Sequence, residues 1–250
     1  MPRFNPADAD LEQHKIGGTH FGFSAAKLAD LGSSEYTLVT LVLDVSGSVH
    51  SFAKGLEDAV KEAVKSCSRS PRADNLLIRV VRFDDRVEEF HGFRPLADVK
   101  IDDYNGVVSS GGMTALFDAT YASVKAMTQY GADLTKNDYQ VNGIVFILTD
   151  GDDNASKTTA KMVAQALAEA RSQEAMESIL PVLIGVNTDA ATGLSTYLEQ
   201  FKNDAGFTQY VEMAKADEKT LAKLGMFISK SVSSQSQALG SGGPSHSLSF

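Results

Sequence analysis

Residues 36–48 read YTLVTLVLDVSGS, and they contain both a strand that decides the fold and the start of a candidate binding site. Residues 36–43 are apolar, aromatic or β-branched, the composition of a strand that is buried on both faces. Asp44, Ser46 and Ser48 follow where that strand is expected to end. Carboxylate and hydroxyl oxygens are ligands that Mg²⁺ accepts, although Asp and Ser are also common turn and helix-cap residues. The choice between a cap and a metal site depends on ligands elsewhere in the chain.

Strand-like and helix-like segments alternate after residue 36. Strands are predicted at 36–43, 75–83, 86–90, 141–148, 179–184 and 208–211, and helices at 51–68, after Thr114, at 158–173, at 193–201 and from about 217 to 232. Uninterrupted apolar strands joined by helices indicate an α/β fold, with a doubly wound, mostly parallel sheet of six strands and helices on both faces. The Asp84-Asp85 pair suits a tight turn, so residues 86–90 are expected to form an antiparallel edge strand.

We divide the chain into three parts. Residues 1–35 are an N-terminal extension, in which alternating Phe21 and Phe23 predict a short strand and 25–31 a short helix. Residues 36–232 are the α/β domain. Residues 233–250 are rich in Ser and Gly and are expected to be a flexible tail.

Composition excludes several classes of function. The net charge of −9 argues against a general nucleic-acid or anionic-membrane binder, and no stretch is apolar enough to span a membrane. The N-terminus has no apolar core of the signal-peptide kind, and Cys67 is the only cysteine. A cytoplasmic location is therefore expected, with Cys67 as a small core residue of its helix. Six of the eight arginines lie between positions 69 and 94, either as a solvated sheet edge or as a basic face for an acidic partner.

Two further segments supply the missing oxygen ligands. Residues 109–114 read SSGGMT and lead into a predicted helix, with Thr114 at or near its start. Thr149-Asp150-Gly151 follows the buried strand at 141–148. Because ligands of open α/β sheets bind outside the carboxyl ends of the strands, these segments and Asp44-Ser46-Ser48 are expected to converge. They offer two carboxylates and three hydroxyls, enough for an octahedral divalent ion that keeps some waters.

DVSGS, GGMTALFDA and ILTDG, in this order and spacing, resemble the von Willebrand factor A (vWA) domain with its metal-ion-dependent adhesion site, over about residues 36–232. The resemblance implies a six-stranded sheet with one antiparallel edge strand. It implies that Ser46, Ser48 and Thr114 hold the ion through their hydroxyls, while Asp44 and Asp150 act mainly through water or from outside the first shell. Mg²⁺ is the expected ion, with Mn²⁺ or Ca²⁺ as alternatives.

The resemblance also implies a protein partner that supplies an Asp or Glu to an open coordination position. Gly112, Met113 and Asp152 lie in the ligand-bearing loops and are expected to contact that partner. Met113 stands between the glycine pair and Thr114, where a common form of the motif runs Gly-Gly-Thr directly. Residues 227–239 resemble the bacterial A-domain proteins encoded with tellurite-resistance and stress operons, which implies an intracellular adaptor. Oligomeric state is not predicted.

Other readings of these residues are weaker. Asp150, Asp152 and Asn154 resemble the start of a calcium loop, but Ala155 and Lys161 stand where that loop needs Gly and Glu. Asp118 is expected to be a structural hydrogen-bonding residue near a helix start. A Mg²⁺-dependent phosphoryl-transfer enzyme would require a second acid near Asp44 and a phosphate-binding cation, which the motifs lack. A structural subunit of a phage or a multiprotein complex could use the same metal site, and stays open beside the adaptor.

Overall fold

The computed structural model describes residues 10–109, 111–172, 175–188, 193–242 and 248–250. Eight strands form one sheet in the order β1-β2-β5-β4-β3-β6-β7-β8. Their bounds are β1 Glu12–Lys15, β2 Gly22–Ala25, β3 Glu35–Asp44, β4 Leu76–Phe83, β5 Val87–Pro95, β6 Gln140–Thr149, β7 Ser178–Val186 and β8 Gln209–Met213. Strands β3, β4, β6, β7 and β8 run parallel, and β5 is antiparallel to β4. The predicted mostly parallel α/β sheet is confirmed.

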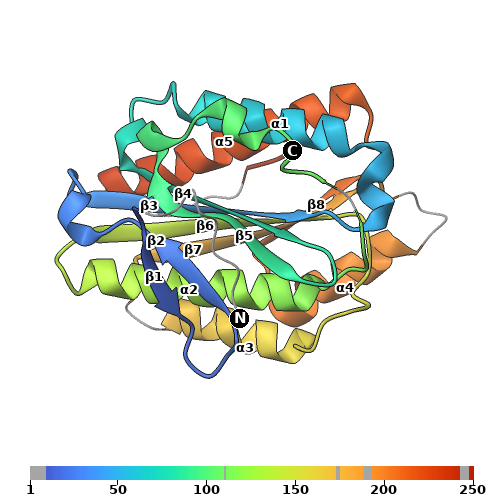
Figure 1. Ribbon diagram of the computed structural model, residues 1–250, viewed down its shortest axis with the longest axis horizontal. Helices are drawn as coiled ribbons and strands as arrows, with labels where there is room; N and C mark the ends of the chain where they lie inside the picture. Colours follow the sequence, from blue (N-terminus) through green and yellow to red (C-terminus); the bar gives the residue numbers. More distant parts are fainter. Residues whose placement is uncertain (1–9, 110, 173–174, 189–192, 243–247) are drawn as a thin grey trace.

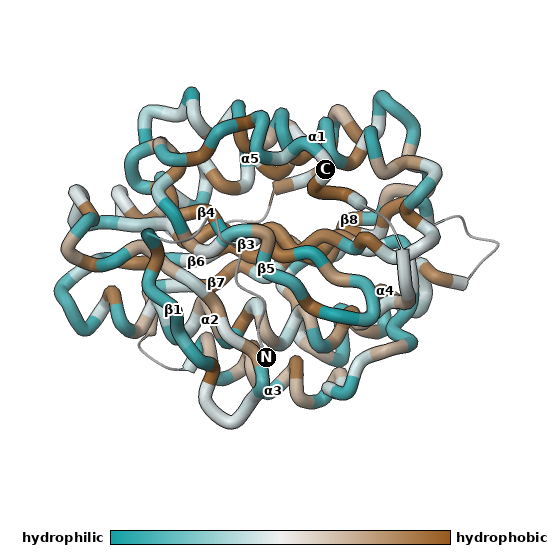
Figure 2. Tube along the Cα trace, viewed as in Figure 1, coloured by the Kyte–Doolittle hydropathy of each residue, from teal (hydrophilic) through white to brown (hydrophobic). Residues whose placement is uncertain are grey.

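Helices cover both faces of this sheet (Figure 1). One layer contains α1 (Ala53–Cys67) and α5 (Glu218–Ser241), and the other contains α2 (Leu116–Thr135), α3 (Ala160–Ser172) and α4 (Leu194–Ala205). Strand β3 contributes to both cores because its side chains alternate: Val39 and Leu41 pack toward α1 and α5, whereas Leu38 and Val42 pack toward α2. The strands are therefore apolar along their whole length, as Figure 2 shows for the centre of the molecule.

The N-terminal extension enlarges the sheet. Strands β1 and β2 form an antiparallel hairpin, and β2 joins β5 where Ala25 lies beside Phe93. The sheet thus has eight strands rather than six, and β5 is flanked by β2 instead of forming a free edge. The strand predicted around Phe23 is confirmed. The helix expected after Ala25 is wrong: only a 3₁₀ turn forms at Leu28–Asp30, because the Ala26 N–H donates to Phe93 O and holds the chain extended.

Four of the six arginines at positions 69–94 form ion pairs in the structure. Arg72 pairs with Glu35, Arg82 with Glu88, and Arg86 with Asp85, while Arg79 forms a buried ion pair with Glu89. These four arginines have acidic partners on neighbouring strands and turns, which agrees with the solvated sheet edge; the basic face for an acidic partner stays a prediction. Cys67 is buried, as predicted for a core residue, and burial raises the pKa of its thiol to about 12. Among the described residues, no helix has the length and apolar character needed to cross a bilayer.

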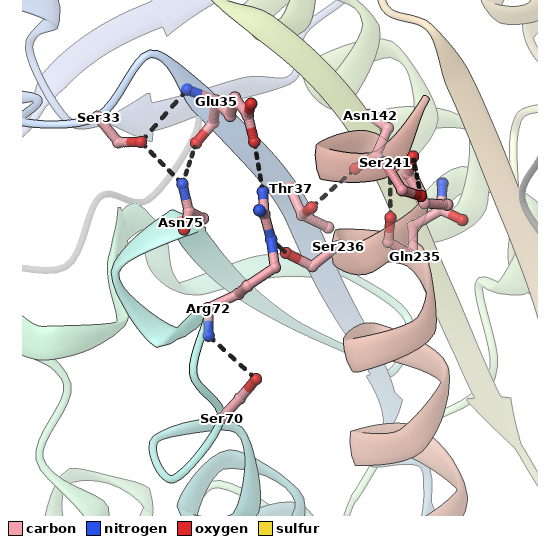
Figure 3. A network of polar contacts seen from close by, with 11 residues as sticks. Ser33, Glu35, Thr37, Ser70, Arg72, Asn75, Asn142, Gln235, Ser236 and Ser241 are labelled. Carbon is pink, nitrogen blue, oxygen red and sulfur yellow. Dashed lines mark hydrogen bonds and ion pairs between the residues drawn. The ribbon is translucent and has the colours of Figure 1, made fainter. Parts of the chain in front are cut away.

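Helix α5 is longer than predicted. It continues to Ser241, so the segment expected to be flexible from residue 233 is helical over its first half. Polar side chains attach these last turns to the amino ends of the strands (Figure 3). Asn142 Nδ2 donates to Gln235 O at 2.7 Å, Gln235 Nε2 donates to Ser178 Oγ at 3.0 Å, and Arg72 Nε donates to Ser236 Oγ at 2.9 Å. The prediction failed because Ser and Gln are buried here with hydrogen-bond partners, while composition alone suggests solvent exposure. Residues 243–247 lie outside the described part.

Replacing Leu239 with Ala tests this packing. Leu239 is 4% exposed, so we expect Leu239→Ala to lower the free energy of unfolding by about 2 kcal/mol or more, measured by chemical denaturation. Gln237→Ala changes an exposed residue of the same turns and serves as the control. Equal stability of the two variants would contradict a packed end of α5.

Candidate metal centre

The parallel pairing of β3 and β6 brings the first and last ligand-bearing segments together. Leu43 lies beside Leu148 in the register, so the residues that follow each strand emerge next to each other. Asp44 is the last residue of β3, and Asp150 directly follows the end of β6 at Thr149. On the other side of β3, the Val45 N–H donates to Phe83 O and ties the start of the DVSGS turn to β4. The site therefore lies at the carboxyl edge of the sheet, as predicted.

Asp44 is buried and both of its carboxylate oxygens accept hydrogen bonds. Oδ1 accepts from the Ser46 N–H at 2.8 Å, and Oδ2 accepts from Thr149 Oγ1 at 2.6 Å. Burial raises the pKa of Asp44 above its ordinary value, and these hydrogen bonds oppose that shift. The role of Thr149 was missed by the sequence analysis. The only sequence signal for this role was that Thr149 ends a predicted strand, which was expected to lie parallel to β3.

Ser46, Ser48 and Asp150 form a connected row of oxygen atoms. Ser46 Oγ lies 3.2 Å from Ser48 Oγ, and Ser48 Oγ donates to Asp150 Oδ1 at 2.8 Å. The pKa of Asp150 is raised to about 6, mainly by burial and in addition by the nearby Asp44 charge, while the Ser48 hydrogen bond opposes the shift. Two carboxylates in this position repel each other, and a bound cation would relieve that repulsion.

The glycine loop brings Thr114 to the same place. The Gly47 N–H donates to Gly112 O at 3.2 Å, and the Gly111 N–H donates to Val45 O at 2.8 Å. On the other side, a Cβ placed on Gly151 would lie 3.3 Å from Thr114 Oγ1, so the Thr114 hydroxyl faces the turn after β6. Thr114 is buried. The structure thus brings all five predicted residues together.

The loop after Asp150 holds the start of α2. Asn154 Oδ1 accepts from the Thr114 N–H at 2.8 Å, and Thr114 O accepts from the Asn154 N–H at 3.0 Å. Asp153 Oδ1 accepts from the Phe117 N–H at 3.1 Å, so it caps the helix from a distant part of the chain. In return, Asp118 Oδ1 accepts from the Thr158 N–H at 2.8 Å, as expected for a structural residue. The positioning roles of Asp153 and Asn154 were missed, because only the folded loop shows them.

The three residues predicted to contact a partner lie on the surface beside the site. Met113 is 56% exposed, and Gly112 and Asp152 are also exposed. Gly112 has a φ of 81°, and a Cβ there would lie 2.9 Å from Asp85 Oδ1. Glycine is therefore required at this position both for its backbone conformation and for the close approach of the Asp84-Asp85 turn.

The donor set fits a hard divalent cation. Three hydroxyls and two carboxylates provide oxygen ligands only, whereas zinc sites are built mainly from Cys and His. No group of three or more His, Cys, Asp or Glu side chains that could hold a metal occurs in the part of the chain that the structure describes. Thr114 Oγ1 also forms no hydrogen bond with any described residue, and so remains available as a ligand.

Comparisons with known proteins show a shared fold. No protein-family model and no curated protein matches the sequence. Proximal thread matrix protein 1 from the mussel byssus matches at 20% identity and a TM-score of 0.55, over 80% of this chain and 47% of that chain. Another structure of that protein has a zinc-occupied MIDAS motif, and matches at 21% identity and a TM-score of 0.54, over 80% of this chain and 46% of that one.

Two proteins of bacterial pili have the same architecture. The PilB minor pilin from Streptococcus sanguinis matches at 17% identity and a TM-score of 0.58, over 85% of this chain and 64% of that chain. The pilus adhesin SpaC from Lactobacillus rhamnosus GG matches at 11% identity and a TM-score of 0.59, over 94% and 36%. This chain spans less than two thirds of each of these proteins. At such low identity the matches establish the fold alone, a doubly wound sheet with helices on both faces.

Metal binding is expected to depend on pH. Cations bind the ionised carboxylate, and Asp150, with its pKa raised to about 6, becomes protonated as the pH falls through that value. The affinity for Mg²⁺, measured by isothermal titration calorimetry, should therefore decrease on acidification, by up to about tenfold per pH unit below the pKa. Asp150→Asn should bind Mg²⁺ more weakly and show a flatter pH profile. Equal pH profiles of the two proteins would contradict a role for Asp150.

Proposed function

We propose that this protein binds a partner protein through a divalent cation held by Asp44, Ser46, Ser48, Thr114 and Asp150. The observation that supports this most is the row of oxygen atoms from Ser46 through Ser48 to Asp150, backed by the buried Asp44. The partner supplies an Asp or Glu side chain, which completes the coordination of the ion.

The contacts of Asp44 support different roles for the five residues, some as direct ligands and some from outside the first coordination shell. Both Asp44 oxygens already accept hydrogen bonds, from Ser46 N and Thr149 Oγ1, so Asp44 acts from outside the first coordination shell. The hydroxyls of Ser46, Ser48 and Thr114 are neutral and would contact the ion directly. A cation held largely by neutral ligands keeps a strong attraction for an incoming carboxylate.

Mg²⁺ is the proposed ion. Octahedral ligands about 2.0–2.1 Å from Mg²⁺ lie roughly 2.9 Å apart when they are adjacent, and Ca²⁺ ligands lie further apart. The Ser46–Ser48 oxygen distance of 3.2 Å lies between the two values, and the Ser48–Asp150 distance of 2.8 Å is that of an ordinary hydrogen bond. The choice of Mg²⁺ therefore rests on the small set of protein oxygens, which leaves room for the waters that Mg²⁺ keeps. Mn²⁺, which prefers similar oxygen ligands, is expected to substitute.

The surroundings of the site suit a protein partner. Met113 offers an exposed apolar side chain beside the ligands, and Asp152 offers a charge that would favour a basic residue next to the partner's acid. Three of the structural neighbours are named as a thread matrix protein, a minor pilin and a pilus adhesin. Those names also support the assembly alternative, in which the same cation joins this protein to other subunits of a larger structure.

The Ser48–Asp150 hydrogen bond also has the geometry of a hydroxyl and a carboxylate base, which is the specific observation behind an enzyme alternative. A phosphotransfer enzyme would turn over simple phosphate esters such as p-nitrophenyl phosphate with Mg²⁺, and would lose that turnover in Ser48→Ala. We favour binding, because Ser48 Oγ and Asp150 Oδ1 also belong to the set of five residues that would hold the cation.

Affinity capture from native lysate, followed by mass spectrometry, tests the proposal. Partners should bind the wild type with Mg²⁺ and elute with chelator, and Ser48→Ala should capture none of them. Ser34→Ala, which makes the same Ser-to-Ala change at an exposed residue just before β3, at the opposite edge of the sheet, is the matched control and should behave like the wild type. The decisive second step replaces each acidic residue at the partner's mapped interface by its amide. If chelator and Ser48→Ala leave capture unchanged, the cation does not mediate binding.

A further inference from the structure

The side chain of Lys61, on α1, contacts an amide and a carboxylate that the metal centre does not use. Its Nζ donates to Asn105 Oδ1 at 2.6 Å and to Glu57 Oε1, one helical turn earlier, at 2.7 Å. Glu57 is buried, and the Lys61 side chain is 15% exposed. These three groups are the ones needed when an amine displaces ammonia from an amide, namely a nucleophile, an acyl group and a proton carrier.

The amide belongs to a turn whose shape is fixed. Residues 104–107 form a β-turn, which is closed by donation from the Val107 N–H to Tyr104 O at 3.1 Å. Asn105 has φ −62° and ψ 120°, and Gly106 has φ 75°, the angles of a type II turn, which favours glycine at its third position. Tyr104 and Val107 are buried, so both ends of the turn are anchored in the protein. The turn therefore holds Asn105 beside Lys61.

Glu57 joins the two sides of this contact. Its Oε1 accepts from Lys61 Nζ, and its Oε2 accepts from the Gly106 N–H at 2.6 Å. Lys54 Nζ also donates to Oε1, at 3.0 Å, and pairs with Asp58 at 2.8 Å. When the Lys61 ammonium passes a proton to Glu57, both groups become neutral, while Lys54 keeps Asp58 as its partner. The transfer therefore leaves no charge without a partner, which is the usual cost of such a step in a buried place.

The charged state of Glu57 is nevertheless the main one. Burial acts to raise the pKa of Glu57, but hydrogen bonds from Lys61, Lys54 and the Gly106 N–H lower it below its ordinary value. The neutral pair is therefore a minor state at neutral pH, and a reaction that passes through it is slow. A slow reaction is sufficient when it takes place once per chain between groups that the fold keeps in contact.

We propose that Lys61 and Asn105 become joined by an isopeptide bond, with Glu57 as the proton carrier. The Lys61 amine attacks Asn105 Cγ, which lies one bond of about 1.2 Å beyond the contacted Oδ1. The Nζ–Cγ bond forms, and the Cγ–Nδ2 bond breaks. Of the three ammonium protons, one stays on the new amide, one passes to Nδ2, which leaves as ammonia, and one is released to solvent through Glu57. The reaction needs no metal, cofactor or second substrate.

The new bond joins α1 to the segment that leads into the glycine loop of the metal centre. Val107 and Val108 follow the turn and are buried, and Gly111 comes soon after them. A covalent link between residues 61 and 105 also restricts the unfolded chain, and so stabilises the fold as a disulfide does. Because no cation takes part, the bond forms whether or not the protein binds a partner through a metal.

Mass spectrometry of the full chain tests the proposal. After prolonged incubation in a neutral to mildly alkaline buffer with chelator, the denatured wild type should have a mass lower by one ammonia than its sequence requires. A proteolytic digest should contain the peptides of Lys61 and Asn105 joined to each other, with the fragment ions placing the link at these two residues.

Three variants remove one participant each. Lys61→Arg keeps the positive charge but has no primary amine, Asn105→Ala removes the acyl group, and Glu57→Gln cannot take up the proton. Each should keep its full mass, and circular dichroism checks that each is folded. Lys65→Arg changes an exposed lysine one turn later in α1, and as the matched control it should lose ammonia as the wild type does.

Three results would overturn the proposal. A wild type that keeps its full mass after incubation means that Lys61 and Asn105 share only a hydrogen bond. Loss of ammonia that persists in Lys61→Arg means that the Gly106 nitrogen, and not Lys61, attacks the Asn105 side chain. A cross-link that forms equally fast in folded Glu57→Gln contradicts the role of Glu57. None of these results depends on the metal-dependent function, because chelator is present throughout.

Discussion

The buried carboxylate of Asp44 is the constraint on which the site depends. It lies at the end of the central strand β3, with one oxygen held by the Ser46 N–H and the other by the Thr149 hydroxyl. The first contact fixes the turn that carries Ser46 and Ser48, and the second joins that turn to β6. Burying this charge has a cost, which shows in the raised pKa of Asp44, and a cation bound nearby would offset it.

Around this carboxylate, the three ligand-bearing loops are joined to one another by hydrogen bonds. The glycine loop bonds to the β3 turn through Gly47 and Gly111, and the loop after Asp150 bonds to Thr114 through Asn154. These contacts place three neutral hydroxyls in front of the charge. A pre-positioned set of this kind binds an ion without reorganising, and leaves the ion attractive to a carboxylate from outside. The exposed Met113 adds apolar surface at the same point.

Much of this arrangement could be predicted because it depends on local pattern. Apolar strands such as β3 and β6 end at their polar residues, and parallel strands bring those ends together. The failures involve long-range contacts. The alternation of Phe21 and Phe23 predicted a strand, but its pairing with the sheet at Ala25 and Phe93 has no signature in that segment. The end of α5 is held by hydrogen bonds from Asn142 and Arg72, which are equally distant in the sequence. The Arg79–Glu89 ion pair could not be predicted either, because its burial depends on how β4 and β5 pack in the folded sheet.

Anomalous diffraction from crystals grown with Mn²⁺ tests the central claim most directly. The account predicts a single strong peak at the carboxyl edge of the sheet, in direct contact with the hydroxyl oxygens of Ser46, Ser48 and Thr114, with Asp44 outside the first shell. Crystals of Ser48→Ala should lose most of that peak. A map without a peak among these three hydroxyls, at a Mn²⁺ concentration that saturates any binding seen in solution, would contradict the account.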